Sequence, residues 1–448
     1  MSRRSFFSAI CILAIISLPL SLCASDTLVM LDKKGIRPAP DDHPATAARN
    51  AAQLNTLLKR YAGSGKWLVL PPGTTWIAEP LLIPSGTRLQ GHPSGSTISI
   101  SKHFVGLQEG FVVNTDFVLY TSNQNKEIFL RDLTLDANNV TPASGQPRGF
   151  FMNKVQHLQM INLQVVNTAA EAIRVDVTNA ESSTKNVLIN GCTVQLTQLS
   201  APAVMVRSHT RSGNNAEKEP TRTSNVAITQ CRVLGGSHNI MLFNVADALI
   251  SNNQCERAAQ RGIILSPTCA GISVTNNRVQ KAGSTGIHVA YHGTDIRIDS
   301  NVVSGTVADQ SGIGIEGQGI KAYAGFQRIR IRYNECFDNA TDGIALEGGG
   351  TGEDFIIESN YCHGNKRNGI RLMAGALTID RPTDLSGGTV QQNRLLQNAG
   401  SPIFIGSDNK GQNKVRRTLV KNNQFGNESR KKVETEYVEG SNSIEDNP

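Results

Sequence analysis

The chain has 448 residues and is mildly basic, with 44 lysines and arginines against 37 aspartates and glutamates and a formal net charge of +7. Its basic residues form no dense stripe interleaved with aromatic side chains, which argues against nucleic acid as a partner. After Ser25 no apolar run is long enough to span a membrane, which argues against a transmembrane span in the mature chain.

Residues 1–25 have the features of an export signal. Two arginines precede an apolar run that ends at Leu22 and is shorter than the roughly 20 residues of a membrane helix. The Ser-Arg-Arg-x-Phe-Phe start also resembles the twin-arginine export motif, so the export route stays open. Lipoprotein anchoring at Cys23 is a less favoured alternative, because Leu22 is bulky where a small residue is expected. We predict an exported protein, periplasmic or extracellular.

Residues 26–125 predict an N-terminal cap and the first coils of a stacked structure. Apolar residues recur at helical spacing between Ala48 and Tyr61, which predicts one helix over about 45–61. Residues 67–70 then predict a strand, followed by a turn at Pro71-Pro72-Gly73. A helix at this place would cover the apolar cross-section of the first coil.

A five-residue pattern then occurs ten times between Arg148 and Ile405: a small residue, an apolar one, any residue, an apolar one, any residue. Its copies start 23 to 36 residues apart, a spacing typical of a solenoid in which each coil gives one strand to a shared sheet. Alternation along a strand sends the apolar residues inward and every second side chain outward. The most regular copies start at Gly262, Gly286, Gly312, Gly343 and Gly369.

A second pattern, apolar-x-apolar-x-x-Asn-x-apolar, lies between the copies of the first. Asparagine tolerates a left-handed bend, and stacked amides bond to one another along the axis. We therefore predict a ladder of Asn253, Asn277, Asn301, Asn334, Asn360, Asn393 and Asn423.

Six cysteines lie beyond the leader, and five of them fall at or beside the ladder position. No Cys-x-x-Cys occurs, so we predict buried free thiols in place of disulfides or a metal site.

The helix near the start, the Leu-Pro-Pro-Gly turn, the Leu-x-Gly step at Leu89 and the asparagine ladder together resemble the pectate-lyase-like superfamily of right-handed parallel β-helix proteins. The resemblance covers nearly the whole mature chain. It implies an all-β fold: a single right-handed parallel β-helix of about ten coils, with an N-terminal capping helix. We assign the parallel β-helix to residues 126–427 and a polar C-terminal tail to residues 428–448. The superfamily includes polysaccharide lyases, C5-epimerases, polygalacturonase-type hydrolases and phage tailspikes, so the fold alone selects no function.

In this superfamily the sheet that lines the carbohydrate groove corresponds to the glycine-isoleucine repeats. Four consecutive coils there place His288, Glu316, Glu347 and Arg371 outward, and we predict them as catalytic residues in one solvent-facing groove. Coils lie about 4.8 Å apart, so Glu316 and Glu347 are expected to be stacked neighbours. Such carboxylates repel, and a Ca²⁺ ion between them is one interpretation; no other cofactor is implied.

Further candidates lie beside this row. Asp342 precedes a repeat strand and resembles the acidic strand start of polygalacturonase-type hydrolases, but the rest of that pattern is missing. It is either catalytic or a turn cap. Expanded turns, including 317–326 and 374–388, form a rim near the row. The predicted substrate contacts are Tyr291, His292, Lys321 and Tyr323, with Arg174 and Arg207 as outer contacts or plain surface pairs.

Three functions stay open, and we favour an enzyme. The first is proton abstraction from an acidic polysaccharide by a lyase or C5-epimerase. In it Arg371 or Lys321 neutralises a uronate carboxylate and His288 or His292 is the base, with a tyrosine as acid. The second is glycoside hydrolysis with paired carboxylates. The third is a polysaccharide-binding or assembly protein without catalysis. The sequence gives neither the sugar nor the oligomeric state.

Overall fold

The computed structural model describes residues 28–106, 109–118, 124–141, 145–177, 182–196, 198–208, 223–307, 318–323, 325–347, 351–375, 384–407, 414–426, 432–436, 442–445 and 447. The predicted leader and Glu316 lie outside these residues. The chain divides into two compact units. The first is Met1–His209, Thr221–Arg232 and Ala246–Leu249; the second is Thr210–Pro220, Val233–Val245 and Ile250–Pro448.

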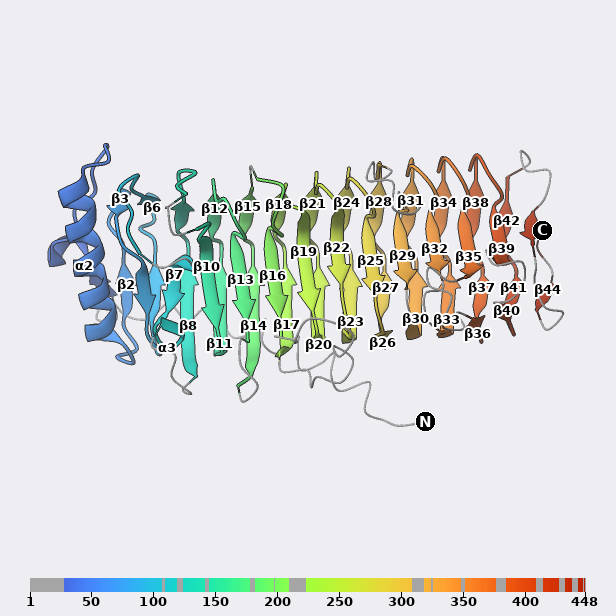
Figure 1. Ribbon diagram of the computed structural model, residues 1–448, viewed down its shortest axis with the longest axis horizontal. Helices are drawn as coiled ribbons and strands as arrows, with labels where there is room; N and C mark the ends of the chain where they lie inside the picture. The colour runs from blue at the N-terminus through green and yellow to red at the C-terminus, as the bar shows by residue number, and fades with distance from the viewer. Residues whose placement is uncertain are drawn as a thin grey trace. The chain divides into compact units, whose positions relative to one another are not determined.

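The first unit starts with a capping helix and continues as parallel coils. Helix α2 (Pro44–Tyr61) buries Leu54, Leu57 and Leu58 and packs against β3 and β4 of the first coil, as Figure 1 shows in blue. The predicted capping helix is thereby confirmed. The elements of this unit are β1 (Leu28–Met30), η2 (Asp32–Lys34), β2 (Trp67–Val69), β3 (Gly73–Ile77), β4 (Leu81–Ile83), β5 (Arg88–Gln90), β6 (Ser96–Ile100), β7 (Gly110–Asn114), α3 (Thr115–Val118), β8 (Asn125–Arg131), β9 (Thr134–Asp136), β10 (Arg148–Asn153), β11 (Val155–Ile161), β12 (Gln164–Val166), β13 (Ile173–Asp176), β14 (Thr184–Asn190), β15 (Thr193–Gln195), β16 (Val204–Arg207) and β17 (Thr223–Thr229).

The second unit repeats the same coil of three strands. The strands with residues in both units are β18 (Arg232–Leu234) and β20 (Val245–Ser251). Those of the second unit are β19 (His238–Phe243), β21 (Gln254–Glu256), β22 (Arg261–Leu265), β23 (Ala270–Thr275), β24 (Arg278–Gln280), β25 (Ile287–Ala290), β26 (Gly293–Thr294), β27 (Arg297–Asp299), β28 (Val302–Ser304), β29 (Ile320–Tyr323), β30 (Phe326–Arg332), β31 (Glu335–Phe337), β32 (Ile344–Glu347), β33 (Gly352–Glu358), β34 (Tyr361–His363), β35 (Ile370–Ala374), β36 (Leu385–Ser386), β37 (Thr389–Gln391), β38 (Arg394–Leu396), β39 (Ile403–Ser407), β40 (Val415–Arg416), β41 (Leu419–Lys421), β42 (Gln424–Phe425), β43 (Val433–Thr435) and β44 (Ser443–Glu445).

One strand of each coil belongs to the sheet that contains the small-apolar copies, and we call the strands of this sheet the repeat strands. They are β4, β7, β10, β13 and β16 in the first unit and β19, β22, β25, β29, β32, β35, β39 and β43 in the second. The described residues thus hold 13 repeat strands, more than the predicted ten or so coils. The all-β parallel fold is confirmed, with inward residues such as Ile287, Val289 and Leu346 fully buried. Each such side chain contributes about 1.5–3 kcal/mol by leaving water.

One copy of the repeat was assigned wrongly from the sequence. The predicted copy spans 312–316, whereas the strand between β25 and β32 is β29, which starts at Ile320. Ile320 pairs with Ile287 on one side and with Ile344 on the other. Lys321 is therefore an outward residue of a repeat strand, not part of a rim loop.

The asparagine ladder is confirmed. Each side-chain amide from Asn253 onward donates to the next asparagine oxygen at 2.9–3.0 Å, and the series continues past Asn423 to Asn447. The left-handed residue is the one before each ladder position, for example Tyr333 with φ 56°. A second ladder runs through Asn339, Asn365 and Asn398 and was not predicted. The ladder amides therefore bind neighbouring coils, and the residues before them make the bend.

Glycine begins the repeat strands because the next coil lies too close for a side chain. A Cβ atom at Gly286 would lie 2.6 Å from the carbonyl oxygen of Gly319, and one at Gly319 would lie 2.7 Å from that of Gly343. Real Cβ atoms do not approach this closely, so backbone contact sets the distance between these coils.

The predictions for the cysteines agree with the structure. All six cysteines of the described part are buried and outside disulfides, and Cys336 pairs in register with Cys362. Within that part, no helix has the length and apolar character needed to cross a membrane.

Candidate functional site

Several of the predicted residues come together on the outward side of β25, β29, β32 and β35 in the second unit. His288, Lys321, Ala345 and Arg371 occupy the same position on these four strands, in register. Glu347 lies two residues after Ala345 on β32. We call His288, Lys321, Glu347 and Arg371 the central row.

Glu347 joins the two cations of the central row. Its Oε2 lies 2.8 Å from Lys321 Nζ, and its Oε1 lies 2.5 Å from Arg371 Nη1. Ala345 lies between the two cations in register, and its small side chain leaves room for the carboxylate. The side chains of Lys321, Glu347 and Arg371 are only 7%, 14% and 9% exposed. The prediction of a solvent-facing groove is therefore wrong, because ion pairing draws these long side chains together in a shielded site.

Asp342 lies at the edge of the central row and is fully buried. Its Oδ1 accepts hydrogen bonds from the backbone N (3.1 Å) and the side-chain Nδ2 (2.7 Å) of Asn368 in the next coil. Its Oδ2 lies 4.0 Å from Arg371 Nη1. Burial raises the pKa of Asp342, although Arg367 and Arg371 oppose the shift. Its bonds to Asn368 favour the turn-cap interpretation over the catalytic one.

His288 is buried and receives a hydrogen bond on Nδ1 from Arg261 Nε, at 2.7 Å. Burial, Arg261, Lys321 and His238 hold the pKa of His288 well below its usual value, so the imidazole is neutral. Because Nδ1 accepts, the proton lies on Nε2, which has no hydrogen-bond partner among the described residues. His288 is therefore arranged as a hydrogen-bond donor, and this geometry does not support the predicted role as a base.

Positive charge exceeds negative charge around the central row. The contacts include four cations, Arg261, Lys321, Arg367 and Arg371, but two carboxylates. Arg371 Nε is a second buried donor that has no hydrogen-bond partner within the described part of the chain. His288 and Arg371 are three strands apart, roughly 14 Å between Cα atoms. The site therefore offers separated donors to an anionic ligand.

Glu316 falls within 308–317, outside the described residues. The residue paired with Glu347 on the neighbouring strand is Tyr323, so the prediction of stacked Glu316 and Glu347 is wrong. Both oxygens of Glu347 also contact cations, which does not support calcium there. In the described residues, no three His, Cys, Asp or Glu side chains group closely enough to hold a metal ion.

The rim residues follow β25 directly. Tyr291 and His292 both have left-handed backbones, with φ of 55° and 64°, and Tyr291 is 50% exposed. The backbone N of His292 donates to the carbonyl oxygen of Gly325 at 2.8 Å. Both residues directly follow the strand that carries His288, and their role as substrate contacts stays a prediction. Tyr323 is on β29, and its side chain is outside the description.

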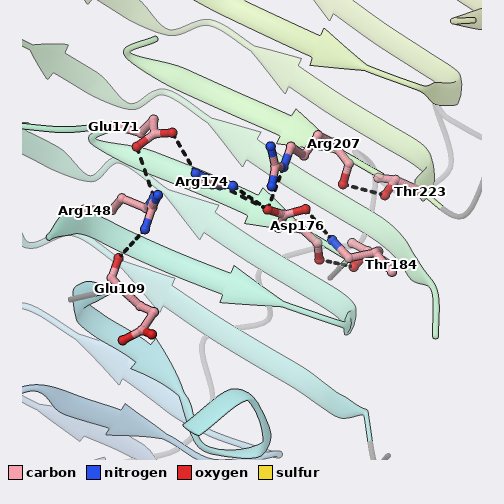
Figure 2. Close-up of polar contacts among 9 residues, drawn as sticks. Glu109, Arg148, Glu171, Arg174, Asp176, Thr184, Arg207 and Thr223 are labelled. Atoms are coloured by element: carbon pink, nitrogen blue, oxygen red, sulfur yellow. Dashed lines mark hydrogen bonds and ion pairs between the residues drawn. The ribbon is translucent and has the colours of Figure 1, made fainter. Parts of the chain in front are cut away.

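Arg174 and Arg207 lie in the first unit, on β13 and β16 (Figure 2). Arg174 is buried and bound on all three nitrogens by Glu171 and Asp176, at 2.7–3.1 Å. Arg207 Nε donates to Asp176 Oδ2 at 2.7 Å. Each nitrogen of Arg174 is therefore already held by a carboxylate, whereas Arg207 is held through Nε alone among the described residues.

Of the charged residues just before the small residue of a repeat, the sequence interpretation considered only Asp342 and missed the others. Arg148, Glu171 and Arg261 stand there, as does Asp342. Each side chain contacts the outward residues of its own or a neighbouring strand, as the Arg261 bond to His288 shows. The recurrence of charged residues at this fixed place was the signal available.

A family model described as a right-handed beta helix region matches residues 148–303. The chain is a right-handed parallel β-helix. Three solved structures share the fold. A Dettilon tailspike protein is 13% identical, with a TM-score of 0.60, over 85% of this chain and 68% of its own. PfbA, a surface adhesin of Streptococcus pneumoniae, is 12% identical, with a TM-score of 0.57, over 86% and 93%.

The third is the periplasmic alginate epimerase AlgG, 13% identical with a TM-score of 0.52, over 86% of this chain and 82% of its own. No curated protein matches the sequence. At these identities the likenesses establish the fold and leave the function open.

Proposed function

We propose that the chain binds an acidic polysaccharide along the central row and abstracts the proton beside a uronate carboxylate, as a lyase or C5-epimerase. The observation that carries the proposal is the excess of buried cations, with two donors, His288 Nε2 and Arg371 Nε, that have no hydrogen-bond partner in the described parts of the chain. A carboxylate accepts hydrogen bonds only, and it gains most where water is excluded.

In this proposal His288 Nε2 and the neighbouring Lys321 bind the carboxylate of the reacting sugar, close to the residues that follow β25. Lowering the charge on that group makes the adjacent proton more acidic. Glu347 orients Lys321 and Arg371, and Arg371 Nε binds the carboxylate of a second sugar three strands away. The base comes from the rim, where His292 is the candidate and Tyr291 supplies the returning proton. The leader further supports export to the periplasm or beyond.

Hydrolysis has less support. The two described carboxylates, Glu347 and Asp342, contact the same Arg371 Nη1, at 2.5 and 4.0 Å. The guanidinium therefore lies between them, where a hydrolase would hold the scissile bond.

The test is hydrogen exchange at C5. A panel of uronate polymers and neutral glycans is incubated in D₂O and followed by NMR, ultraviolet absorbance of unsaturated ends, and reducing-end release. We expect one uronate polymer to react. An epimerase places deuterium at C5, whereas a lyase removes the C5 proton and leaves unsaturated ends. Arg371→Ala and His292→Gln should abolish exchange. Arg278→Ala, which removes an exposed arginine from β24, should not.

Two results would overturn the proposal. Reducing ends without unsaturated ends and without C5 exchange indicate hydrolysis. Tight binding without exchange or cleavage of any polymer indicates a binding or adhesion protein. Melting curves of each variant show whether lost exchange reflects lost folding.

A further inference from the structure

Five charged residues on the outward side of β10, β13 and β16 form a chain of alternating sign in the first unit (Figure 2). The order is Arg148, Glu171, Arg174, Asp176, Arg207. The three inner groups are 7%, 8% and 0% exposed, whereas the side chains of the two end arginines are 24% and 27% exposed. The chain thus ends in a partly exposed cation on each side.

The three inner side chains, Glu171, Arg174 and Asp176, form ion pairs with one another and with the end arginines. Glu171 accepts from Arg148 on one oxygen and Arg174 on the other, at 3.1 and 2.9 Å. Asp176 accepts from Arg174 and Arg207 on Oδ2 and from the backbone N of Val177 on Oδ1. Burying such groups is costly, and well-packed apolar residues are often as stable. The inner groups position the end arginines and contact no ligand themselves.

Both end arginines are held by Nε. Arg207 Nε lies 2.7 Å from Asp176, and Arg148 Nε lies 3.1 Å from Glu171. Both Nη atoms of Arg207 have no hydrogen-bond partner among the described residues, and Arg148 gives only Nη1 to the carbonyl oxygen of Glu109. Arg148 also lies over the Phe151 ring at 5.0 Å, which fixes its plane. A guanidinium anchored this way presents a preorganised fork for an oxyanion.

We infer that Arg148 and Arg207 form a second binding site, which takes a glycan bearing carboxylate or sulfate groups. The two arginines are on repeat strands two coils apart, roughly 10 Å along the axis, and the register sets them five residues apart, roughly 16 Å along the strands. One glycan chain can therefore place separate anionic groups on the two forks. The inference does not rest on the chemistry proposed for the central row.

The experiment measures binding of four defined probes by calorimetry: hexagalacturonate, its methyl ester, sulfated cellohexaose and cellohexaose. We expect the anionic probes alone to bind this site. Arg148→Ala and Arg207→Ala should each weaken binding of the preferred anionic probe about tenfold, the equivalent of one charged hydrogen-bonded contact. Arg207→Lys should recover only part of the lost binding, because an ammonium group cannot donate two parallel hydrogen bonds to one oxyanion as a guanidinium does.

The matched control is Lys126→Ala with Lys185→Ala, which removes two exposed charges from β8 and β14 of the same unit. The inference is overturned if this control weakens binding as much as the arginine pair, or if neither anionic probe responds to Arg148→Ala with Arg207→Ala. Both double variants are measured again in the Arg371→Ala protein, which separates this site from the central row. The weakening caused by Arg148→Ala with Arg207→Ala should persist in that protein. Preference for the galacturonate or the sulfated probe tells which oxyanion is bound.

Discussion

Replacing Glu347 by glutamine is expected to destabilise the protein as well as inactivate it. Glu347 is the carboxylate between Lys321 and Arg371, at 2.8 and 2.5 Å, and all three side chains are less than 15% exposed. Removing one partner of a buried pair costs about 3–5 kcal/mol, because the remaining charge stays buried. The amide keeps one acceptor oxygen, so we expect about 3 kcal/mol.

That loss corresponds to roughly 6–12 °C in melting temperature for a unit of this size. If Glu347 instead faced solvent, as predicted from the sequence, the melting temperature would change by only about 1–2 °C. Differential scanning calorimetry separates the two expectations. An acidic oligosaccharide should also stabilise the glutamine variant more than the wild type, because it supplies the missing negative charge.

Glu256 provides the control, since its ion pairs with Arg257 and Lys281 are exposed and long, at 3.3 and 3.9 Å. Glu256→Gln should shift the melting temperature by less than about 3 °C. If Glu347→Gln melts within the range of this control, the buried ion-pair assignment is refuted.

Three more outcomes are expected. Asn334→Ala should cost roughly 3 kcal/mol in urea unfolding, because two donors of Asn301 lose their acceptor; a cost under about 1 kcal/mol would count against the ladder. Burial lowers the pKa of His238 to about 4 and that of His288 well below normal, so stability should be full above about pH 6.5 and fall by about 1.4 kcal/mol per pH unit and histidine toward pH 4. His238→Asn and His288→Asn should flatten this slope in pH-dependent unfolding. Burial raises the pKa of Cys336, so iodoacetamide should label it only after unfolding, as mass spectrometry would show; rapid labelling of the native protein would contradict its place in the core.

The fold was accessible from sequence because a stacked coil needs similar side chains at the same places in every turn. The asparagines of the ladder recur for this reason, and the glycines do so because the next coil approaches closely. The wrong copy at 312–316 shows the limit. Both 312–316 and 319–323 fit the small-apolar pattern, and only hydrogen bonding of Ile320 to its two neighbouring strands selects the second.

The strands that carry the candidate site could be predicted from the sequence, but the ion pairs, the burial and the protonation of its side chains could not. Alternation gives the direction in which His288, Glu347 and Arg371 leave the sheet, and the structure brings them together with Lys321. The alternation of inward and outward residues along a strand does not predict which long side chains form ion pairs or how far these pairs are shielded from solvent. Nor does it predict which imidazole nitrogen carries the proton. The bond from Arg261 decides the last point, and Arg261 lies at a position that the repeat pattern does not include.

The glycines that begin the repeat strands give the outward surface a fixed pitch. Hydrogen bonds between parallel strands set the spacing, and a Cβ at Gly286 would lie 2.6 Å from the carbonyl oxygen of Gly319, so a larger residue there would disturb it. Charged side chains on successive coils are thus separated, along the axis, by whole multiples of the distance between neighbouring coils. A polymer whose charges are spaced at a multiple of the distance between coils can contact a charged side chain with each of its own charges. A polymer with a different charge spacing loses this match after a few sugar units. Such a surface selects its ligand by periodicity, independently of the ligand's length.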